Sequence, residues 1–524
     1  MIRAVLVATT ILISSHSIAL GGEKTKKTTR TTQAKQTTAA RSGKVTALRG
    51  PLTLEGAIST ALRQNPDLLR ALKEIERTRG QVIEVRAQAL PRVVANANYF
   101  QQDKYLLERG GGTSSSSASP IEFTDELGNE VTFDTGGGGG GGSFGGGDKT
   151  WRVTLEARQL LYSGGQVGAA LKIARFTEDQ AYYLLRDTVD RVIATVRTQF
   201  YRVLLNRKLI TVAEESIRLL EDQLRDQQNR LDAGTVPRFN VLQAEVALAN
   251  SQPDLIRARN NYLVAQLELS RTLGLEASKN ATGRPNFNVV GELRVMERRI
   301  PLQAALALAR ERRPFLKAQR QNILTEEQQI TVAKAGLKPR VEANAGWEFR
   351  NSRRTDDLSK EVNGWYYGIN GEWAIFDGFE TKGRVMQAHA RLASAHITFA
   401  DSVLQVELEV QQAFARLQVA RELIASQVKV VEQADEALRL ARERLSAGAG
   451  TQLDVLNAQV AITRARTTQQ QALFDFNVAL AEFERATGAD TVYDNTFPDP
   501  RTEQAKVRLR KGVTELREDP ALQK

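Results

Sequence analysis

The sequence has no cysteine among its 524 residues. Disulfide bonds, thiolate metal sites, thiol redox chemistry and a lipid-modified cysteine are therefore excluded. Histidine is scarce too, and the two histidines outside the N-terminal segment, His389 and His396, lie seven residues apart without an indicated third ligand. Because no nucleophile or phosphate-loop motif is present either, we expect neither enzyme activity nor a metal or cofactor.

The chain also lacks an apolar run of the ~20 residues that a membrane-spanning helix needs. Its longest such stretch, Ala4–Ile13, follows Arg3 and precedes the small residues Ser17 and Ala19. This order is typical of a secretory signal peptide, so residues 1–19 are predicted to be a cleaved leader, with a membrane anchor as the alternative.

Acidic residues are missing mainly from one segment. The formal net charge is +11, yet residues 20–50 contain eight Lys or Arg and only one acidic residue, Glu23. The excess charge therefore belongs to a Thr-rich, basic N-terminal arm, which we expect to be disordered. Contact with anionic lipid or cell-wall polymer is an alternative role for this arm, and no nucleic-acid partner is predicted.

Self-similarity, in contrast, is abundant. The segment RLDAGTVPRFNVLQAEVALA (Arg230–Ala249) matches RLSAGAGTQLDVLNAQVAIT (Arg444–Thr463) without a gap, at an offset of 214. PRVVANA from Pro91 likewise matches PRVEANA from Pro339, at an offset of 248. The chain is therefore an internal duplication. We predict repeats at 51–275 and 299–490, a linker at 276–298 and a C-terminal tail at 491–524.

Each repeat contains segments whose apolar residues recur at steps of three and four, as in Ile210, Ala213, Ile217, Leu220 and Leu224. This spacing predicts long helices packed against each other, and we expect a helical hairpin at 165–274 and another at 379–488.

The hairpin turns have residues suited to a reversal of the chain. Gly234 and Gly448 lie where a helix end needs a left-handed residue, and Pro237 is predicted in the first turn of the return helix. Thr451 and Asp454 have the spacing of a capping box. Both hairpins are therefore predicted to end in defined tips.

Polar and apolar residues alternate in four segments, at about 92–100, 151–160, 340–350 and 365–375. Strands of this length can cross a bilayer when tilted. These predicted strands contain all four tryptophans, a residue typical of membrane interfaces: Trp151, Trp347, Trp365 and Trp373. The alternative is a half-buried sheet of a soluble domain.

Residues 101–150 include a glycine run and are expected to form a mobile extracellular loop.

The order of these parts resembles the TolC-like outer-membrane efflux protein family over residues 51–490. The similarity lies in the Asn65-Pro66 and Arg313-Pro314 openings, the repeated PR-x-x-ANA, the LYSGG and IFDG strand exits and the two tips. It implies an α+β membrane protein in which each chain contributes four strands to the 12-stranded β-barrel of a homotrimer. The resemblance also implies a periplasmic α-helical barrel that continues this β-barrel. Four strands alone cannot close in lipid, which agrees with the need for partners.

The resemblance also implies a function. Family members are outer-membrane exit ducts of tripartite efflux pumps or type I secretion systems, and they work with a periplasmic adaptor and an inner-membrane transporter. The alternative is a periplasmic coiled-coil structural or adaptor protein without a pore. The transported substrate is not predicted.

The family pattern assigns roles to residues of the tips. Adaptor docking falls on Arg230, Gly234, Thr235, Arg444, Gly448, Gly450 and Thr451. A pore constriction falls on Asp454, on Asn457 one turn later, and on Asn240, which the offset pairs with Asp454. Asn457 is neutral where relatives are acidic, which argues against strong cation binding there. Asp454 has a second interpretation as a residue that only stabilises the helix start.

Overall fold

The computed structural model describes residues 50–101, 103, 121–124, 130–133, 149–275, 285, 287–295, 300–351 and 358–488. The predicted signal peptide, the basic arm up to residue 49, most of the glycine-rich loop and the C-terminal tail lie outside these residues. All the elements below belong to the unit Val45–Lys524.

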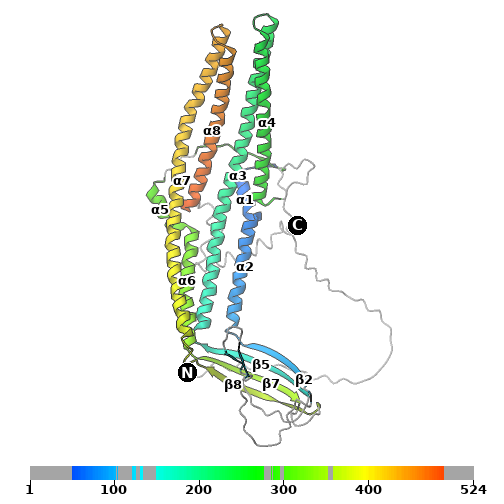
Figure 1. Cartoon of the computed structure of the whole chain (residues 1–524), viewed down its shortest axis with the longest axis vertical. Coiled ribbons are helices and arrows are strands. Elements are labelled where there is room, and N and C mark those ends of the chain that lie inside the picture. The colour runs from blue at the N-terminus through cyan, green and yellow to red at the C-terminus, as the bar shows by residue number, and fades with distance from the viewer. Residues whose placement is uncertain are drawn as a thin grey trace, which may run out of the picture. The chain divides into compact units, whose positions relative to one another are not determined.

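Two repeats with the same order of elements make up the described chain (Figure 1). The first contains α1 (Leu54–Gln64), α2 (Pro66–Ala87), β2 (Arg92–Gln101), β5 (Lys149–Ser163), α3 (Gln166–Asp232) and α4 (Arg238–Leu273). The second contains α5 (Leu302–Arg312), α6 (Pro314–Lys334), β7 (Arg340–Asn351), β8 (Glu361–Glu372), α7 (Glu380–Ser446) and α8 (Gln452–Thr487). This order confirms the predicted fold class of duplicated helix, strand-hairpin and helical-hairpin units.

The corresponding helices are equally long in the two repeats. Both α3 and α7 have 67 residues, and both α4 and α8 have 36. At about 1.5 Å per residue, α3 and α7 each extend roughly 100 Å. Helices of this length are stabilised by neighbouring helices rather than by one globular core.

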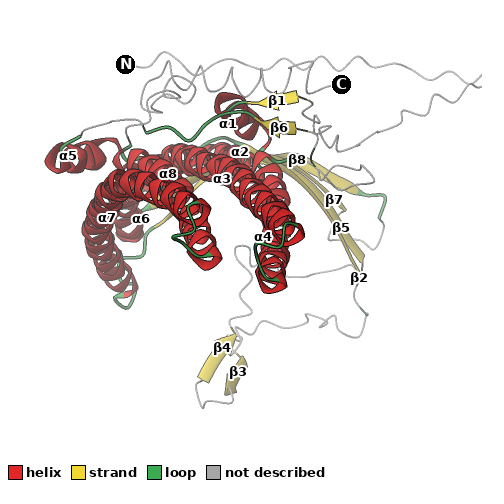
Figure 2. Cartoon of the chain, turned by 90° about the horizontal axis from the view of Figure 1, so that it is seen from above, coloured by secondary structure: helices red, strands yellow, loops and turns green. Residues whose placement is uncertain are grey.

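The helices form a curved layer (Figure 2). Near the tips its order is α4, α3, α8, α7, and near the sheet its order is α2, α3, α6, α7. Thus α3 and α7 run through both halves of the layer. The place that α4 occupies beside α3 near the tips is taken by α2 near the sheet, and the place of α8 is taken by α6. Apolar side chains near the levels where one helix ends and the next begins are fully buried. They include Val196 and Leu269 in the first repeat and Val410 and Phe476 in the second.

A close contact joins α4 to the corner between α1 and α2. Gly274 ends α4 with φ +73°, and a Cβ atom there would lie 2.3 Å from the carbonyl oxygen of Gln64. Asn65 caps α2 and donates a hydrogen bond of 2.8 Å from Nδ2 to the carbonyl oxygen of Thr272. Glycine is therefore required for both the turn and the contact.

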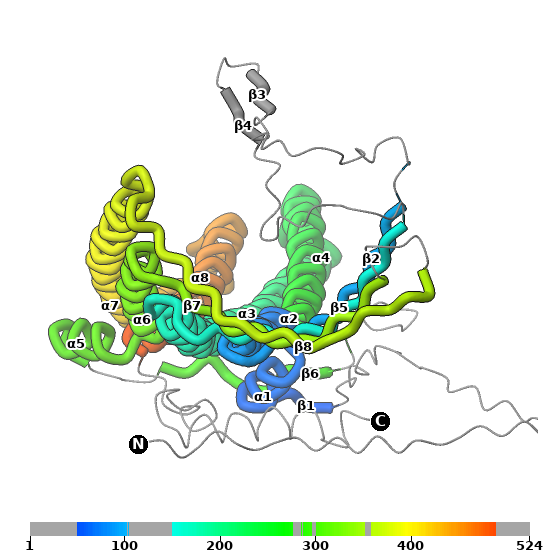
Figure 3. Tube along the Cα trace, turned by 90° about the horizontal axis from the view of Figure 1, so that it is seen from below, coloured from blue at the N-terminus to red at the C-terminus, as the bar shows by residue number. Residues whose placement is uncertain are grey.

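The strands form one antiparallel sheet in the order β2, β5, β7, β8 (Figure 3). The prediction for β8 was wrong at its end, because the strand stops at Glu372 and Trp373 lies beyond it. The indole N–H of Trp373 donates to the carbonyl oxygen of Leu337, 3.2 Å away, as the chain turns toward α7. The strands therefore contain three of the four tryptophans.

Two small strand pairs were not predicted. β1 (Gly50–Leu52) and β6 (Phe287–Val289) pair in parallel, which brings residues of the predicted linker beside the start of the first repeat. β3 (Ile121–Thr124) and β4 (Glu130–Phe133) form a hairpin within the glycine-rich loop. In these eight residues apolar residues alternate with polar ones in the sequence, a pattern that favours strand pairing.

Candidate functional site

One face of the four-stranded sheet is apolar and exposed. The strand register places the odd-numbered residues of β2, β7 and β8, and those of β5 before its bulge, on this face. Its large exposed side chains are Val93, Tyr99, Val153, Leu155, Phe349, Trp365, Tyr367 and Ile369. Trp365 is 78% exposed and Tyr367 is 89% exposed. A contiguous apolar face of this kind marks a surface that contacts lipid or another protein.

The opposite face is polar. Arg158 Nη2 lies 2.8 Å from Glu156 Oε2, and Glu348 Oε1 lies 3.2 Å from Arg350 Nε and 3.5 Å from Arg152 Nε. The face is therefore lined by paired charges. Sheets with one apolar and one polar face occur where the two faces meet different surroundings.

Both edges of this sheet are open within the described residues. β2 pairs only with β5, and β8 pairs only with β7. Their outward backbone N–H and C=O groups therefore lack a partner among the described strands. Open edges such as these are sites where another strand can be added.

Exposed apolar residues also follow α4 and α7, the outer helices of the layer near the tips. On α4 these are Phe239, Leu242, Val246 and Ile256, and on α7 they are Leu404, Leu408, Val419 and Leu423. Successive members are 3, 4 and 10 residues apart on α4 and 4, 11 and 4 residues apart on α7. These distances are sums of helical steps of three and four, so each set lies on one side of its helix. Each stripe is suited to packing against a further helix.

Both tips end their first helix in the same backbone motif. Thr235 N–H donates to the Arg230 carbonyl and Gly234 N–H to the Leu231 carbonyl, each at 2.9 Å. In the second tip, Ala449 and Gly448 make the equivalent bonds at 2.8 and 3.2 Å. Gly234 and Gly448 have φ +72° and +75°. These are Schellman motifs, in which a left-handed residue satisfies the last carbonyl groups of the helix.

The side chains around the tips differ between the repeats. In the first tip Arg230 pairs with Asp226 at 2.9 Å, and in the second Arg444 donates from Nη2 to the Ala449 carbonyl at 3.3 Å. A Cβ atom on Gly450 would lie 3.1 Å from Arg444, so the second tip packs closely against the end of α7. Pro237 is the N-cap of α4 rather than a residue of its first turn, a one-residue correction that follows from its extended ψ of 154°.

A complete capping box starts α8. Asp454 N–H donates to Thr451 Oγ1 at 3.2 Å, and Thr451 N–H donates to Asp454 Oδ2 at 2.9 Å. Hydrogen bonding from Thr451, with a smaller contribution from the positive charge of Arg444, lowers the pKa of Asp454. This carboxylate therefore remains charged at neutral pH and stabilises the helix start.

The three residues of the predicted constriction lie on two helices. Asp454 and Asn457 are exposed one turn apart on α8, whereas Asn240 is half-buried on α4. Because α3 lies between α4 and α8, one chain does not bring Asn240 beside Asp454. The seven predicted docking residues all lie in the last turns of α3 and α7 or in the loops that follow.

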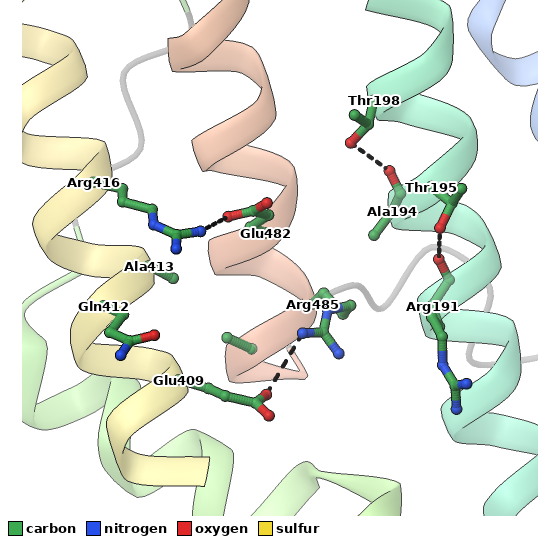
Figure 4. A pocket seen from close by; sticks show the side chains of 11 residues that line it. Arg191, Ala194, Thr195, Thr198, Glu409, Gln412, Ala413, Arg416, Glu482 and Arg485 are labelled. Atoms are coloured by element: carbon green, nitrogen blue, oxygen red, sulfur yellow. Dashed lines mark hydrogen bonds and ion pairs between the residues drawn. The ribbon is translucent and has the colours of Figure 1, made fainter. Parts of the chain in front are cut away.

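The sequence interpretation missed a charged cavity of about 410 Å³ between α3, α7 and α8 (Figure 4). Arg416 pairs with Glu482 at 2.9 Å, and Arg485 with Glu409 at 3.5 Å. The available signal was the spacing of these charges within apolar periodic segments, three residues apart on α8 and seven apart on α7. The pairs largely neutralise each other, which favours a structural role.

Within the part of the chain that the structure describes, no helix combines the length and the apolar run required to span a bilayer. The same residues contain no group of three or more histidine, aspartate and glutamate side chains placed to hold a metal ion.

The sequence profile described as Outer membrane efflux protein matches residues 57–275 and 305–489. The chain is 25% identical to Protein CyaE of Bordetella pertussis over 59% of this chain and 64% of CyaE. It is 24% identical to Alkaline protease secretion protein AprF of Pseudomonas aeruginosa over 62% of this chain and 66% of AprF. The matched region thus spans slightly less than two thirds of these two relatives.

Solved structures share the fold. The Campylobacter jejuni CmeC outer membrane channel superimposes with a TM-score of 0.67, covering 88% of this chain and 89% of CmeC at 15% sequence identity.

Proposed function

Because the chain belongs to the outer membrane efflux protein family, we propose that it is an outer-membrane exit duct that works as a homotrimer. The duct passes substrates from an inner-membrane transporter and a periplasmic adaptor across the outer membrane. Residues 1–19 direct export as a signal peptide, and the helical part lies in the periplasm.

The observation that carries this proposal is the exposed apolar face of the sheet. Side chains such as Trp365 and Tyr367 have no partner layer within the described residues, whereas the opposite face is charged. In a membrane the apolar face contacts lipid and the polar face lines a water-filled lumen. Since open strand edges are not tolerated in lipid, β2 of one copy pairs with β8 of the next. Three copies then supply twelve strands.

The apolar stripes on α4 and α7 support the same assembly. These helices are the outermost of the layer near the tips, so α4 of one copy packs against α7 of the next. Burial of side chains such as Ile256 and Leu423 then stabilises the trimer by roughly 1.5–3 kcal/mol each.

The proposal also places the adaptor at the tips. At each tip a glycine-containing turn reverses the chain between two long helices. Arg230 and Arg444 lie in the last turns of α3 and α7, beside these turns. The relatives suggest two kinds of cargo, since AprF is named for protease secretion and the family is named for efflux.

Two neighbouring residues of β5 test the membrane assignment. Leu155 lies on the apolar face and Thr154 on the polar face, where it pairs with Glu348 in the strand register. Leu155→Arg is expected to destabilise insertion by roughly 2–4 kcal/mol and abolish heat-modifiable trimers in the outer membrane. Thr154→Arg is the matched control and should assemble. Equal assembly of both variants would contradict the assignment and favour a periplasmic coiled-coil protein.

A further inference from the structure

A second cavity, of about 550 Å³, lies where the sheet meets the helices. It is lined by the end of α6, the start of α7, the turn between α6 and β7, and the adjoining ends of β5 and β8. The sequence interpretation assigned nothing to this junction.

Two glycines allow the elements to meet here. Gly164 has φ +64°, and a Cβ atom on it would lie 2.9 Å from Cβ of Lys338. A Cβ atom on Gly336 would lie 2.6 Å from Oγ1 of Thr381 at the start of α7. The strand exit therefore packs directly against the turn that carries Lys338, and this turn packs against α7.

The cavity is strongly basic. Four of its lining residues are cationic, namely Lys338, Arg340, Arg384 and Arg391, and only Glu372 is anionic. Arg384 pairs with Glu380, and Arg340 lies 4.0 Å from Glu342. Lys338 and Arg391 form no ion pair with any described residue. Two cations without an ion-pair partner thus line one cavity together with a single carboxylate, Glu372, which leaves a net positive charge. Polar side chains such as Gln329 and Gln387, which can donate hydrogen bonds, lie beside them.

The strand register indicates the side on which the cavity opens. Arg340 pairs with Glu372, and both share the face of Glu342 and Asn370. This is the polar face of the sheet, opposite the apolar residues Val341 and Ile369. In the proposed trimer the polar face lines the lumen, so the cavity opens into the duct.

We propose that this cavity is an anion-binding station of the duct, which binds phosphate or carboxylate groups of solutes that pass from the helical part to the sheet. The inference rests on the proposed function, because it needs the trimeric lumen. Three copies bring six unpaired cations around one passage, and guanidinium and ammonium groups bind such oxyanions through charge-assisted hydrogen bonds. The field of the three cavities raises the local concentration of anions.

The test is the ion selectivity of the full-length trimer in planar bilayers at ~0.1 M KCl, where the Debye length is about 10 Å. Lys338→Gln combined with Arg391→Gln should lower the chloride-to-potassium permeability ratio roughly two- to threefold. Millimolar inorganic pyrophosphate should block the current of the unmodified channel, and the double variant should lose this block. The matched control is Lys208→Gln combined with Lys429→Gln, which removes two exposed cations from α3 and α7 away from the junction.

Three outcomes would overturn the inference while leaving the duct intact. These are a channel with unchanged selectivity, an equal shift in the control variant, and pyrophosphate block that persists in the double variant. A fourth comes from mass spectrometry of bound lipids: if the junction variant specifically loses phosphatidylglycerol, the phosphate is a lipid headgroup and the cavity faces the membrane. Absence of any channel activity in the unmodified protein would instead contradict the proposed function.

Discussion

The guanidinium group of Arg313 donates a hydrogen bond of 2.8 Å from Nη1 to the backbone carbonyl oxygen of Arg485. The same side chain, which is only 5% exposed, pairs with Glu409 at 2.8 Å. Arg313 directly precedes the first proline of α6, and Arg485 lies in the last turn of α8. One buried cation therefore joins the end of α8 to the start of α6 and to the continuous helix α7.

Asn65 makes the corresponding contact in the first repeat, where it precedes the proline of α2 and donates to the carbonyl of Thr272 in α4. The two residues occupy equivalent positions, at the offset of 248. The duplicated fold thus places a side-chain donor before the proline, where it bonds to a backbone carbonyl in the last turn of the ending helix. The Arg485 carbonyl also accepts a hydrogen bond of 3.2 Å from the N–H of Gly488.

Removal of the Arg313 side chain should destabilise the protein. Arg313→Ala leaves the Arg485 carbonyl without this donor and Glu409 without its closest cation, for an expected loss of about 2–4 kcal/mol. Thermal unfolding of detergent-solubilised protein measures it. Arg310→Ala is the control, since Arg310 forms an exposed ion pair with Glu407 and should change stability by less than about 1 kcal/mol. Equal losses would show that burial of Arg313 contributes nothing.

Gly448→Val should deform the second tip without disrupting the trimer. A Cβ atom on Gly448 meets nothing within 4 Å, so the penalty is conformational and amounts to roughly 1–2 kcal/mol at φ +75°. We expect trimers in the outer membrane but weaker crosslinking to the adaptor and reduced export. Gly80→Val is the control, because Gly80 lies within α2, has equally open space and lacks a positive φ. Normal export by the Gly448 variant would show that the second tip is not part of the docking surface.

Much of this fold could be predicted because the signals are local and occur twice. The tips follow from glycine and capping chemistry within a few residues, and the faces of the sheet follow from alternation. The end of β8 was misplaced because Trp373 continues the alternating pattern, although a contact with Leu337 takes it out of the strand. Tertiary contacts of this kind have no local sequence signal.

The two charged cavities were missed for a related reason. Lys338 and Arg391 are 53 residues apart, and only the packing of α6 against α7 brings them to one cavity. Arg313 was assigned to a helix start by its proline, but its contacts to α7 and α8 depend on where those helices end. Contacts between residues so far apart in the sequence can be identified only from the three-dimensional arrangement of the helices.

The glycine-rich loop provides a test of topology. The predicted loop joins β2 to β5 at the ends of these strands that are remote from α2 and α3. If the helices are periplasmic, an epitope inserted near Gly139, which lies outside the described residues, should be labelled on intact cells. Deletion of the surrounding glycines should leave export unchanged, because the loop-closure free energy depends only weakly on loop length. Labelling only after permeabilisation would show that the loop is not on the cell exterior and would contradict the proposed topology.

The capping box predicts how the second tip responds to acid. The folded pKa of Asp454 is lowered from its usual value of 3.8, mainly by hydrogen bonding from Thr451. Its stabilisation is therefore fully present above the unfolded pKa and is lost as the pH falls through the lower folded pKa. Hydrogen exchange of the tip should be slower in the unmodified protein than in Asp454→Asn at pH 6, and the difference should vanish well below pH 3.8. A difference that persists there would assign the protection to another group.

Asp454 and Asn457 together test the proposed constriction. Both side chains are exposed one turn apart on α8, so three copies would place like residues at one level of a narrow lumen. Charges added there act through poorly screened space and bias the passing ions. Asp454→Asn should lower the preference for cations in planar bilayers, and Asn457→Asp should raise it. Glu361→Gln, at the start of β8, removes an exposed acidic charge far from the tips and serves as the control. If neither tip substitution shifts the reversal potential, Asp454 only stabilises the start of α8 and the constriction lies at another level.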